Sequence, residues 1–222
     1  MARLDEALRA SIWGRALGAE ELARVAGEII ERRFPAGSYV CRDGEAVLHW
    51  IGVIDGLVKL CKVSAEGKAA TLAGVPAGGW FGEGSLLKAE PRRYDGVALR
   101  DSHIALMPRA TFTRLLDSSI PFNRFLLEQL NERLAQFIAM LEYERLLDPD
   151  ARVARCLAWL FNPILYPRIG QRVQVSQEEI GNLSGISRQR VNQALQTLEK
   201  DGLLRVEYGG LTILDLEGLR KR

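Results

Sequence analysis

The sequence predicts an α+β protein with N-terminal helices, an antiparallel β-roll, one long helix and a C-terminal winged helix-turn-helix. Three observations support this fold class. Glycines punctuate short apolar runs between residues 34 and 108, apolar residues recur at helical spacing over residues 122–147, and two amphipathic segments joined by a glycine occupy residues 176–200. With 222 residues, of which 47% are hydrophobic and 26% charged, the chain is long enough for two domains with buried cores.

Residues 4–30 are predicted to be helical, because apolar side chains recur three and four residues apart, with interruptions near Gly14 and Gly18. From Phe34 to Pro108 the sequence pattern changes to short apolar runs separated by glycines. The predicted strands are SYVC, LHWIGVI, LVKLCKV, TLAGV, YDGVAL and HIALM. Turn signals separate them at residues 42–44, 66–67 and 76–79. Short strands of this kind form a compact antiparallel barrel or roll.

A long helix is predicted from Phe122 to Leu147, directly after Pro121. The length of this amphipathic helix exceeds what packing against a small roll requires. We therefore expect a partner helix, most simply the same helix of a second copy of the chain. The heptad pattern is imperfect, so packing within one chain is the alternative. Asp148 as N-cap and Pro149 at the first helical position then mark a hinge before the next helix. The predicted domains are a β-roll with N-terminal helices (1–120), a dimerisation helix (121–147) and a winged helix-turn-helix (148–222).

The segment VSQEEIGNLSGISRQRVNQALQTLEKDGLL, residues 175–204, predicts two helices joined by a tight turn. Ser176 and Glu179 form an S-x-x-E capping box at the start of the first helix. Gly185 permits the turn, and Ser187 is the N-cap of a second helix with one apolar stripe at i, i+3, i+4 and i+7. Two alternating runs about a glycine pair then predict a β-hairpin. Helix, turn, helix and hairpin together make a winged helix-turn-helix.

The polar face of the second helix predicts contact with the major groove of DNA. Arginine can pair with guanine, and asparagine or glutamine with adenine, through two hydrogen bonds, while a helix N-terminus favours phosphate. A merely solvated face is the alternative, but this one carries no acidic residue before Glu199. The expected DNA-contacting residues are Ser176, Ser187, Arg188, Gln189, Arg190, Asn192 and Gln193.

Composition and charge exclude several classes of protein. A net charge of +2 is too small to indicate nucleic acid by itself, so the DNA hypothesis depends on local placement. No apolar run is long enough for a membrane span, and Asp5 and Glu6 stand where a signal peptide would be basic, so we expect a cytoplasmic protein without membrane contact. Cys41, Cys61 and Cys156 fit neither a disulfide framework nor a zinc site. No catalytic constellation is apparent, so an enzyme is not expected.

The run GSYVCRDGEAVLHWIGVIDGLVKLCKVSAEGKAATLAGVPAGGWFGEGSLL resembles the cyclic-nucleotide-binding roll of the Crp/Fnr superfamily of bacterial transcription regulators. Residues 176–202 resemble the DNA-binding motif of the same family, and the resemblance extends from about Phe34 to the C-terminus. The most specific marks are IDG, FGEGSLL and EEIGNLSGISRQRVNQAL. The resemblance implies a homodimer joined through the long helix, a palindromic site in double-stranded DNA and, for an activator, RNA polymerase as a partner.

The segment FGEGSLLKAEPRRYDG also suits a small anionic effector, because glycine amides can approach a ligand closely and arginines can pair with phosphate. In the superfamily this segment ends in Arg-Ser-Ala or Arg-Thr-Ala, whereas this chain has Arg, Arg and Tyr there. Phe137 and Ile138 stand where cyclic-AMP receptors have a Thr-Ser pair. Both departures argue against cyclic AMP. The candidate effector-binding residues are Gly82, Glu83, Gly84, Ser85, Arg92, Arg93 and Tyr94.

Two interpretations of the roll remain open: a site for a small anion or cyclic nucleotide, or a pocket filled by its own side chains. No iron–sulfur cluster is expected. The oxygen-sensing members of the superfamily carry a cluster of N-terminal cysteines, and no cysteine precedes Cys41 in this sequence. His49 and His103 are expected to be structural rather than haem ligands. The rival function is a cyclic-nucleotide-binding signalling module that acts through protein contacts.

The resemblance also implies an operator different from that of the family's receptors. Their recognition face carries an Arg-Glu pair followed by an Arg, whereas the matching positions here hold Arg188, Gln189 and Gln193. Glutamine presents both a donor and an acceptor where glutamate only accepts, so the preferred base pairs should change.

Overall fold

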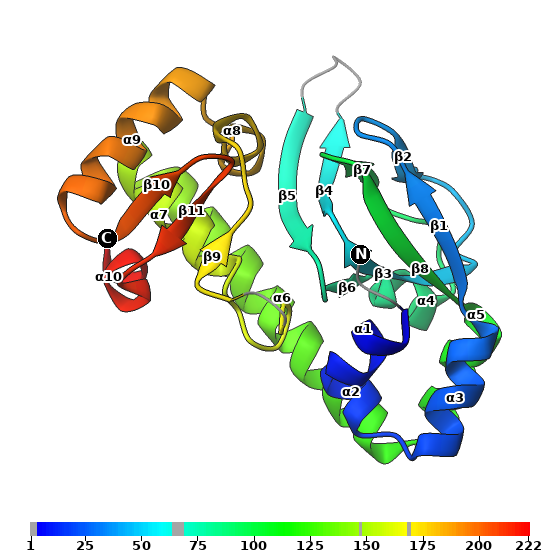
Figure 1. Ribbon diagram of the computed structural model, residues 1–222. Coiled ribbons are helices and arrows are strands. Elements are labelled where there is room, and N and C mark those ends of the chain that lie inside the picture. Colours follow the sequence, from blue (N-terminus) through cyan, green and yellow to red (C-terminus); the bar gives the residue numbers. More distant parts are fainter. Residues whose placement is uncertain (1–3, 64–68, 147, 168–169) are drawn as a thin grey trace.

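The computed structural model describes residues 4–63, 69–146, 148–167 and 170–222. A β-roll covered by short helices lies on one side, a small C-terminal domain lies on the other, and a long helix runs past both (Figure 1). Residues 66–67, expected to form a turn, and Leu147, expected at the hinge, lie outside the described residues.

The N-terminus forms three short helices, α1 (Leu4–Ala10), α2 (Ile12–Arg15) and α3 (Ala19–Glu28). The first interruption is at Ser11 and not near Gly14, so this detail of the prediction is wrong. The Ser11 hydroxyl donates to the Leu8 carbonyl at 2.7 Å and accepts from the Gly14 amide at 3.0 Å, which ends one helix and caps the next. Gly14 lies inside α2, where a Cβ would collide with the Leu8 carbonyl oxygen.

The roll consists of two four-stranded antiparallel sheets, ordered β1-β8-β3-β6 and β2-β7-β4-β5. All strands predicted from the apolar runs are present. Sequence reasoning missed β1, which it assigned in part to a helix, and the two-residue β6. The strands are β1 (Ile30–Phe34), β2 (Tyr39–Cys41), β3 (His49–Asp55), β4 (Leu57–Val63), β5 (Ala69–Pro76), β6 (Trp80–Phe81), β7 (Asp95–Ala98) and β8 (Ser102–Pro108).

Aromatic rings join the N-terminal helices, the roll and the long helix α6 (Ile120–Leu146). Trp50 lies at the centre of this cluster, with its ring centroid 4.5 Å from that of Trp80 and 5.6 Å from that of Trp13. Phe112 of α5 (Arg109–Ser118) and Phe122 of α6 meet Trp50 edge-on at 5.5 Å and 5.7 Å. Such tilted contacts add to the stabilisation from burial and fix the start of α6 against the roll.

The C-terminal domain packs around the expected helix pair. Asp148 is the N-cap of α7, as predicted, since its Oδ1 accepts from the Asp150 and Ala151 amides at 2.8 Å and 3.0 Å. Strand order in the small sheet is β10-β11-β9, so the predicted hairpin gains a third strand. The elements are α7 (Pro149–Trp159), β9 (Arg172–Val173), α8 (Gln177–Ser184), α9 (Arg188–Lys200), β10 (Leu204–Glu207), β11 (Gly210–Ile213) and α10 (Leu216–Lys221).

Arg133 on α6 joins the roll to the loop between α7 and β9. Its Nη2 donates to the Trp80 carbonyl at 2.8 Å, and its Nη1 donates to the Tyr166 hydroxyl at 3.1 Å. Its Nε lies 3.8 Å from the Glu83 Oε1, and the side chains of both residues are more than nine-tenths buried. Burial by itself would lower the pKa of Arg133, but the oxygens of Tyr166, Glu83 and Tyr94 raise it, so the guanidinium remains charged.

Replacing Arg133 should therefore destabilise the protein strongly. Arg133→Met keeps the unbranched apolar stem of the side chain but leaves the Glu83 carboxylate buried without its cation, which costs about 3–5 kcal/mol. Denaturant unfolding followed by circular dichroism, at one fixed protein concentration, measures the loss. Arg124→Met, at an exposed position of the same helix, is the control and should stay within about 0.5 kcal/mol of wild type. Similar losses in both variants would contradict the structural role of Arg133.

Candidate DNA-binding surface and effector pocket

The helix-turn-helix is built by local capping bonds that the sequence predicts. The Ser176 Oγ accepts from the Glu179 amide at 3.2 Å, and the Glu179 Oε2 accepts from the Ser176 amide at 2.6 Å. Gly185 ends α8 with a φ of +68°, a left-handed conformation that favours glycine. The Ser187 Oγ accepts from the Arg190 amide at 3.3 Å and begins α9. The capping box, the turn and the second cap are all confirmed.

Helix α9 separates its apolar and polar residues onto opposite faces. The apolar stripe is fully buried against α7 and the small sheet, and consists of Val191, Ala194, Leu195 and Leu198. The opposite face is exposed over the first turns of the helix, with Arg188, Gln189, Asn192, Gln193 and Gln196 at the surface. The predicted DNA-contacting face is therefore accessible, and the buried stripe holds it rigidly.

Three predicted contact residues of α9, Arg190, Asn192 and Gln193, already bond to side chains within the domain. The Arg190 Nη2 lies 2.7 Å from the Asp150 Oδ1, and its Nη1 donates to the Gln193 Oε1 at 3.3 Å. The Asn192 Oδ1 accepts from the Gln177 Nε2 at 3.0 Å. Sequence reasoning did not select Gln177, although its place directly after the Ser176 cap puts it at the N-terminus of α8. These bonds orient the polar face before any DNA is present.

The roll touches the helix-turn-helix through polar contacts that sequence reasoning missed. The Arg100 guanidinium makes two bonds of 2.8 Å to the Glu179 carboxylate, and its Nη2 also donates to the Gln174 carbonyl at 2.6 Å. The Asn182 side-chain oxygen accepts from the Lys59 Nζ at 3.3 Å. Residues far apart in the sequence carry these contacts, so no local pattern could have revealed them.

The predicted effector segment begins with a glycine in the left-handed backbone conformation. Gly82 has a φ of +95° and precedes the short helix α4 (Glu83–Lys88), which also carries Gly84 and Ser85. The Arg92 side chain lies directly beside Gly82, where an added Cβ would come within 2.5 Å of the Arg92 Nη1. The Arg92 Nη2 donates to the His49 carbonyl at 2.8 Å.

The two adjacent arginines of this segment differ in burial: Arg92 faces the interior and Arg93 faces solvent. Arg92 is only 5% exposed, whereas Arg93 points to solvent and its Nη2 bonds the Glu90 Oε2 at 2.6 Å. The structure thus places Arg92 beside Gly82 and separates Arg93 from it. The Glu83 Oε2 accepts from the Trp50 Nε1 at 3.4 Å.

Tyr94 is kept neutral among these charged groups. Burial, and next the carboxylate of Glu83, raise the pKa of its hydroxyl well above the usual range. Phe137 and Ile138, expected to replace a Thr-Ser pair that faces the nucleotide base, are exposed on α6. Their apolar side chains offer no hydrogen bond to a base.

Two cysteines are buried, and one histidine contacts a carboxylate on a neighbouring strand. Burial raises the pKa of Cys41 to about 11 and that of Cys156 to about 12, so both remain unreactive thiols at neutral pH. The His103 Nε2 lies 2.9 Å from the Glu31 Oε2 across strands β8 and β1. Within residues 4–63, 69–146, 148–167 and 170–222, no group of three or more His, Cys, Asp or Glu could hold a metal ion. No helix in those ranges is both long and apolar enough to span a membrane.

Comparison with known proteins identifies both domains. Residues 31–119 match the cyclic nucleotide-binding domain, and residues 151–222 match the Crp-like helix-turn-helix domain. The transcriptional regulator SdrP of Thermus thermophilus is 30% identical over 76% of this chain and 81% of its own. The chain belongs to the Crp/Fnr superfamily of transcription regulators.

Two further comparisons each cover most of the chain. The cyclic AMP receptor protein of Thermus thermophilus is 27% identical over 89% of each chain. The structure of FixK2 from Bradyrhizobium japonicum shares the fold, with a TM-score of 0.71 at 18% identity over 87% of this chain and 96% of that one. These proteins are transcription regulators or share their fold, so the exposed face of α9 lies on the DNA-binding domain of the family.

Proposed function

We propose that this protein is a cytoplasmic homodimer that binds a palindromic site in double-stranded DNA with α9. The observation that carries the proposal is the exposed polar face of α9 above a fully buried apolar stripe. A two-fold dimer would place its recognition helices roughly 34 Å apart, in successive major grooves. If the protein activates transcription, RNA polymerase is its further partner.

The polar side chains then have separate roles. Arg188 contacts a guanine or its phosphate, and Gln189 and Asn192 contact base edges. Arg190 and Gln193 contact bases or the backbone, and because Asp150 holds Arg190, we favour the backbone for that residue. Ser176 and Ser187, at the two helix N-termini, lie beside phosphates, where backbone amides and helix dipoles favour negative charge.

Arg188→Ala should weaken binding to the cognate site by about 1–3 kcal/mol and relax the preference at one base pair. The site is first selected from genomic fragments by sequencing, and affinities are then measured on cognate and scrambled duplexes. Lys200→Ala, at the far end of the same helix, is the matched control and should leave the base preference unchanged. Equal losses on both duplexes would reduce Arg188 to a phosphate contact. Selection without a palindrome would favour a signalling module that acts through protein contacts.

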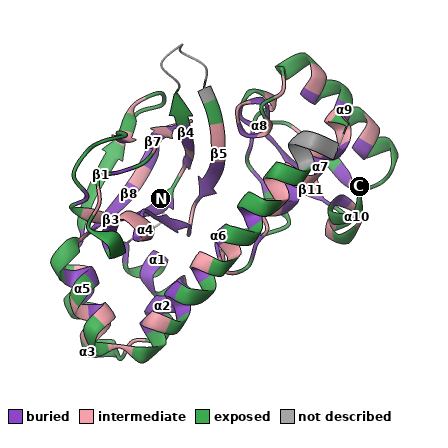
Figure 2. Ribbon diagram, turned by 180° about the vertical axis from the view of Figure 1, so that it is seen from behind, coloured by how far each residue is buried: buried purple, intermediate pink, exposed green. Residues whose placement is uncertain are grey.

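The dimer proposal is supported by a second apolar face on α6. One face packs on the roll through Phe122, Phe125 and Leu126. Another is exposed, with Leu127, Leu134 and Leu141 seven residues apart and 68%, 58% and 59% exposed. Figure 2 shows buried and exposed segments alternating along α6. Leucines repeated at seven-residue spacing are the pattern of a two-stranded coiled coil, so a second copy of α6 is the partner proposed.

Leu134→Glu should convert the dimer into monomers, because it places two carboxylates at the centre of the proposed helix pair. Sedimentation velocity at micromolar concentration measures the change. Leu48→Glu is the control, since Leu48 is similarly exposed, at 61%, but lies on the roll. A dimer that survives Leu134→Glu, or a wild-type protein that sediments as a monomer, would contradict this interface.

The roll is proposed not to bind cyclic AMP. Arg92 lies beside Gly82, Glu83 is engaged by Trp50 and Arg133, Arg93 stands where the family has a hydroxyl residue, and the bulky Tyr94 stands where it has alanine, so the chain's own side chains occupy the segment. A small anion remains the alternative. It is favoured by the Arg92 Nη1, which is buried without a hydrogen-bond partner among the described residues.

Thermal-shift measurements should therefore show no stabilisation by cyclic AMP or cyclic GMP at millimolar concentration. Inorganic phosphate tests the small-anion alternative in the same assay, because a ligand at 100 times its Kd would add about 2.7 kcal/mol of stability. Arg92→Met is the control that locates any effect in this segment. A cyclic AMP shift that Arg92→Met abolishes would overturn the proposal.

A further inference from the structure

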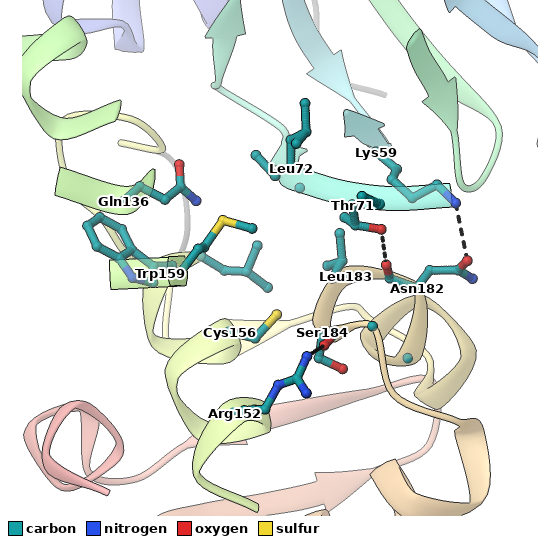
Figure 3. Close-up of a pocket in the computed structure, with 17 residues that line it drawn as sticks. Lys59, Thr71, Leu72, Gln136, Arg152, Cys156, Trp159, Asn182, Leu183 and Ser184 are labelled. Atoms are coloured by element: carbon teal, nitrogen blue, oxygen red, sulfur yellow. Dashed lines mark hydrogen bonds between the residues drawn. The ribbon is translucent and has the colours of Figure 1, made fainter. Parts of the chain in front are cut away.

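A cavity of about 400 Å³ lies between the roll and the C-terminal domain. Its walls come from strand β5, the middle of α6, helix α7 and helix α8 (Figure 3). None of the residues of the predicted effector segment lines it. The space is large enough for a small ligand and is formed only where both domains meet.

Part of the cavity lining is apolar. Leu72 of β5 and Leu183 of α8 lie opposite Trp159 of α7, and Met140 of α6 also lines the cavity. Gly74 also belongs to the wall, and Leu183 packs so closely over it that any Cβ there would collide. These side chains suit an alkyl chain or an aromatic ring, since burial of apolar ligand surface favours binding.

The polar groups of the cavity include two cations, two amides and two hydroxyls. Lys59 and Arg152 line the cavity, and no lining residue is acidic. The Lys59 Nζ bonds the Asn182 Oδ1 at 3.3 Å, and the Arg152 Nη2 bonds the Ser184 carbonyl at 3.1 Å, so each cation keeps further donors. Two uncompensated positive charges in one cavity favour an anionic ligand.

Gln136 of α6 also lines the cavity, and the residue is only 4% exposed. Its Oε1 has no hydrogen-bond partner among the described residues, but it also has almost no accessible surface, so an occupant of the cavity does not reach it. The apolar lining and the two cations therefore define the occupant, which should combine an apolar chain with a negative charge.

We propose that this cavity binds an amphipathic carboxylic acid. Its apolar chain lies among Leu72, Trp159 and Leu183, and its carboxylate pairs with Lys59, with Arg152 as the second cation of the cavity. Because the walls belong to both domains, an occupant stabilises the domain arrangement of this structure. The site does not depend on how the protein contacts DNA.

N-Octanoylglycine is the probe, because it combines an alkyl chain with a carboxylate. The chain has three methionines, and of these Met140 lines the cavity while Met107 is buried in the core of the roll. In protein labelled with ¹³C at the methionine methyl groups, the Met140 signal, assigned with Met140→Leu, should shift saturably. The Met107 signal should stay in place.

Matched ligands and variants test each part of the proposal. N-Octanoylglycine amide lacks the charge, so it should bind about tenfold more weakly than the probe. Lys59→Met should weaken the probe about tenfold, whereas Lys62→Met, on the same strand but paired with Asp43, should have no effect.

Three results would overturn the proposal: an unshifted Met140 signal at millimolar probe, equal affinity for the acid and its amide, or equal affinity in Lys59→Met and Lys62→Met. An unchanged Met107 signal confirms that each variant is folded. If the probe binds instead to the exposed stripe of α6, Lys59→Met leaves its affinity unchanged, which also counts against the cavity.

Discussion

The buried guanidinium of Arg133 constrains the whole arrangement. A charge removed from water is tolerated only when acceptors surround it, so the Trp80 carbonyl, the Tyr166 hydroxyl and the Glu83 carboxylate must stay close. These acceptors belong to the roll and to the loop after α7, while Arg133 belongs to α6. Moving one segment away from the others would leave a buried charge or carbonyl unpaired, so the three segments hold one another in place.

This constraint also explains the state of the predicted effector segment. The Glu83 carboxylate, a candidate effector-binding group in the sequence, is already close to Arg133 and accepts from Trp50. Arg92 is turned inward to the His49 carbonyl. The segment keeps the glycine turn and the charged residues of the family, but the chain's own groups satisfy most of them. The Arg92 Nη1 has no hydrogen-bond partner in the part of the chain that the structure describes.

The sequence predicted best where the signals are local. The capping box at Ser176, the turn at Gly185 and the cap at Ser187 each depend on residues within four positions, and all three are present. Strand β1 escaped prediction because IERRF is mostly exposed and charged at the edge of its sheet. The choice between Arg92 and Arg93 depends on which of two neighbours faces inward, which tertiary packing decides. The Arg100–Glu179 pair joins residues 79 positions apart, beyond the reach of any periodic pattern.

Contacts of different strength divide the C-terminal half into a rigid body and a looser junction. Helix α9 is anchored through wholly buried apolar residues shared with α7, and such packing resists deformation. Helix α8 meets the roll through the partly exposed Arg100–Glu179 pair, the Lys59–Asn182 bond, a bond from the Thr71 hydroxyl to the Asn182 carbonyl, and the Leu183 side chain, which packs over Gly74. Partly exposed ion pairs contribute little net stability, so this junction is weaker than the packing of α9. The Glu179 carboxylate also accepts from the Ser176 amide in the cap of α8. A displacement at this junction would therefore move α7, α8 and α9 together and leave the exposed face of α9 intact, and the cavity between the domains is the part of the molecule that such a displacement would open or close.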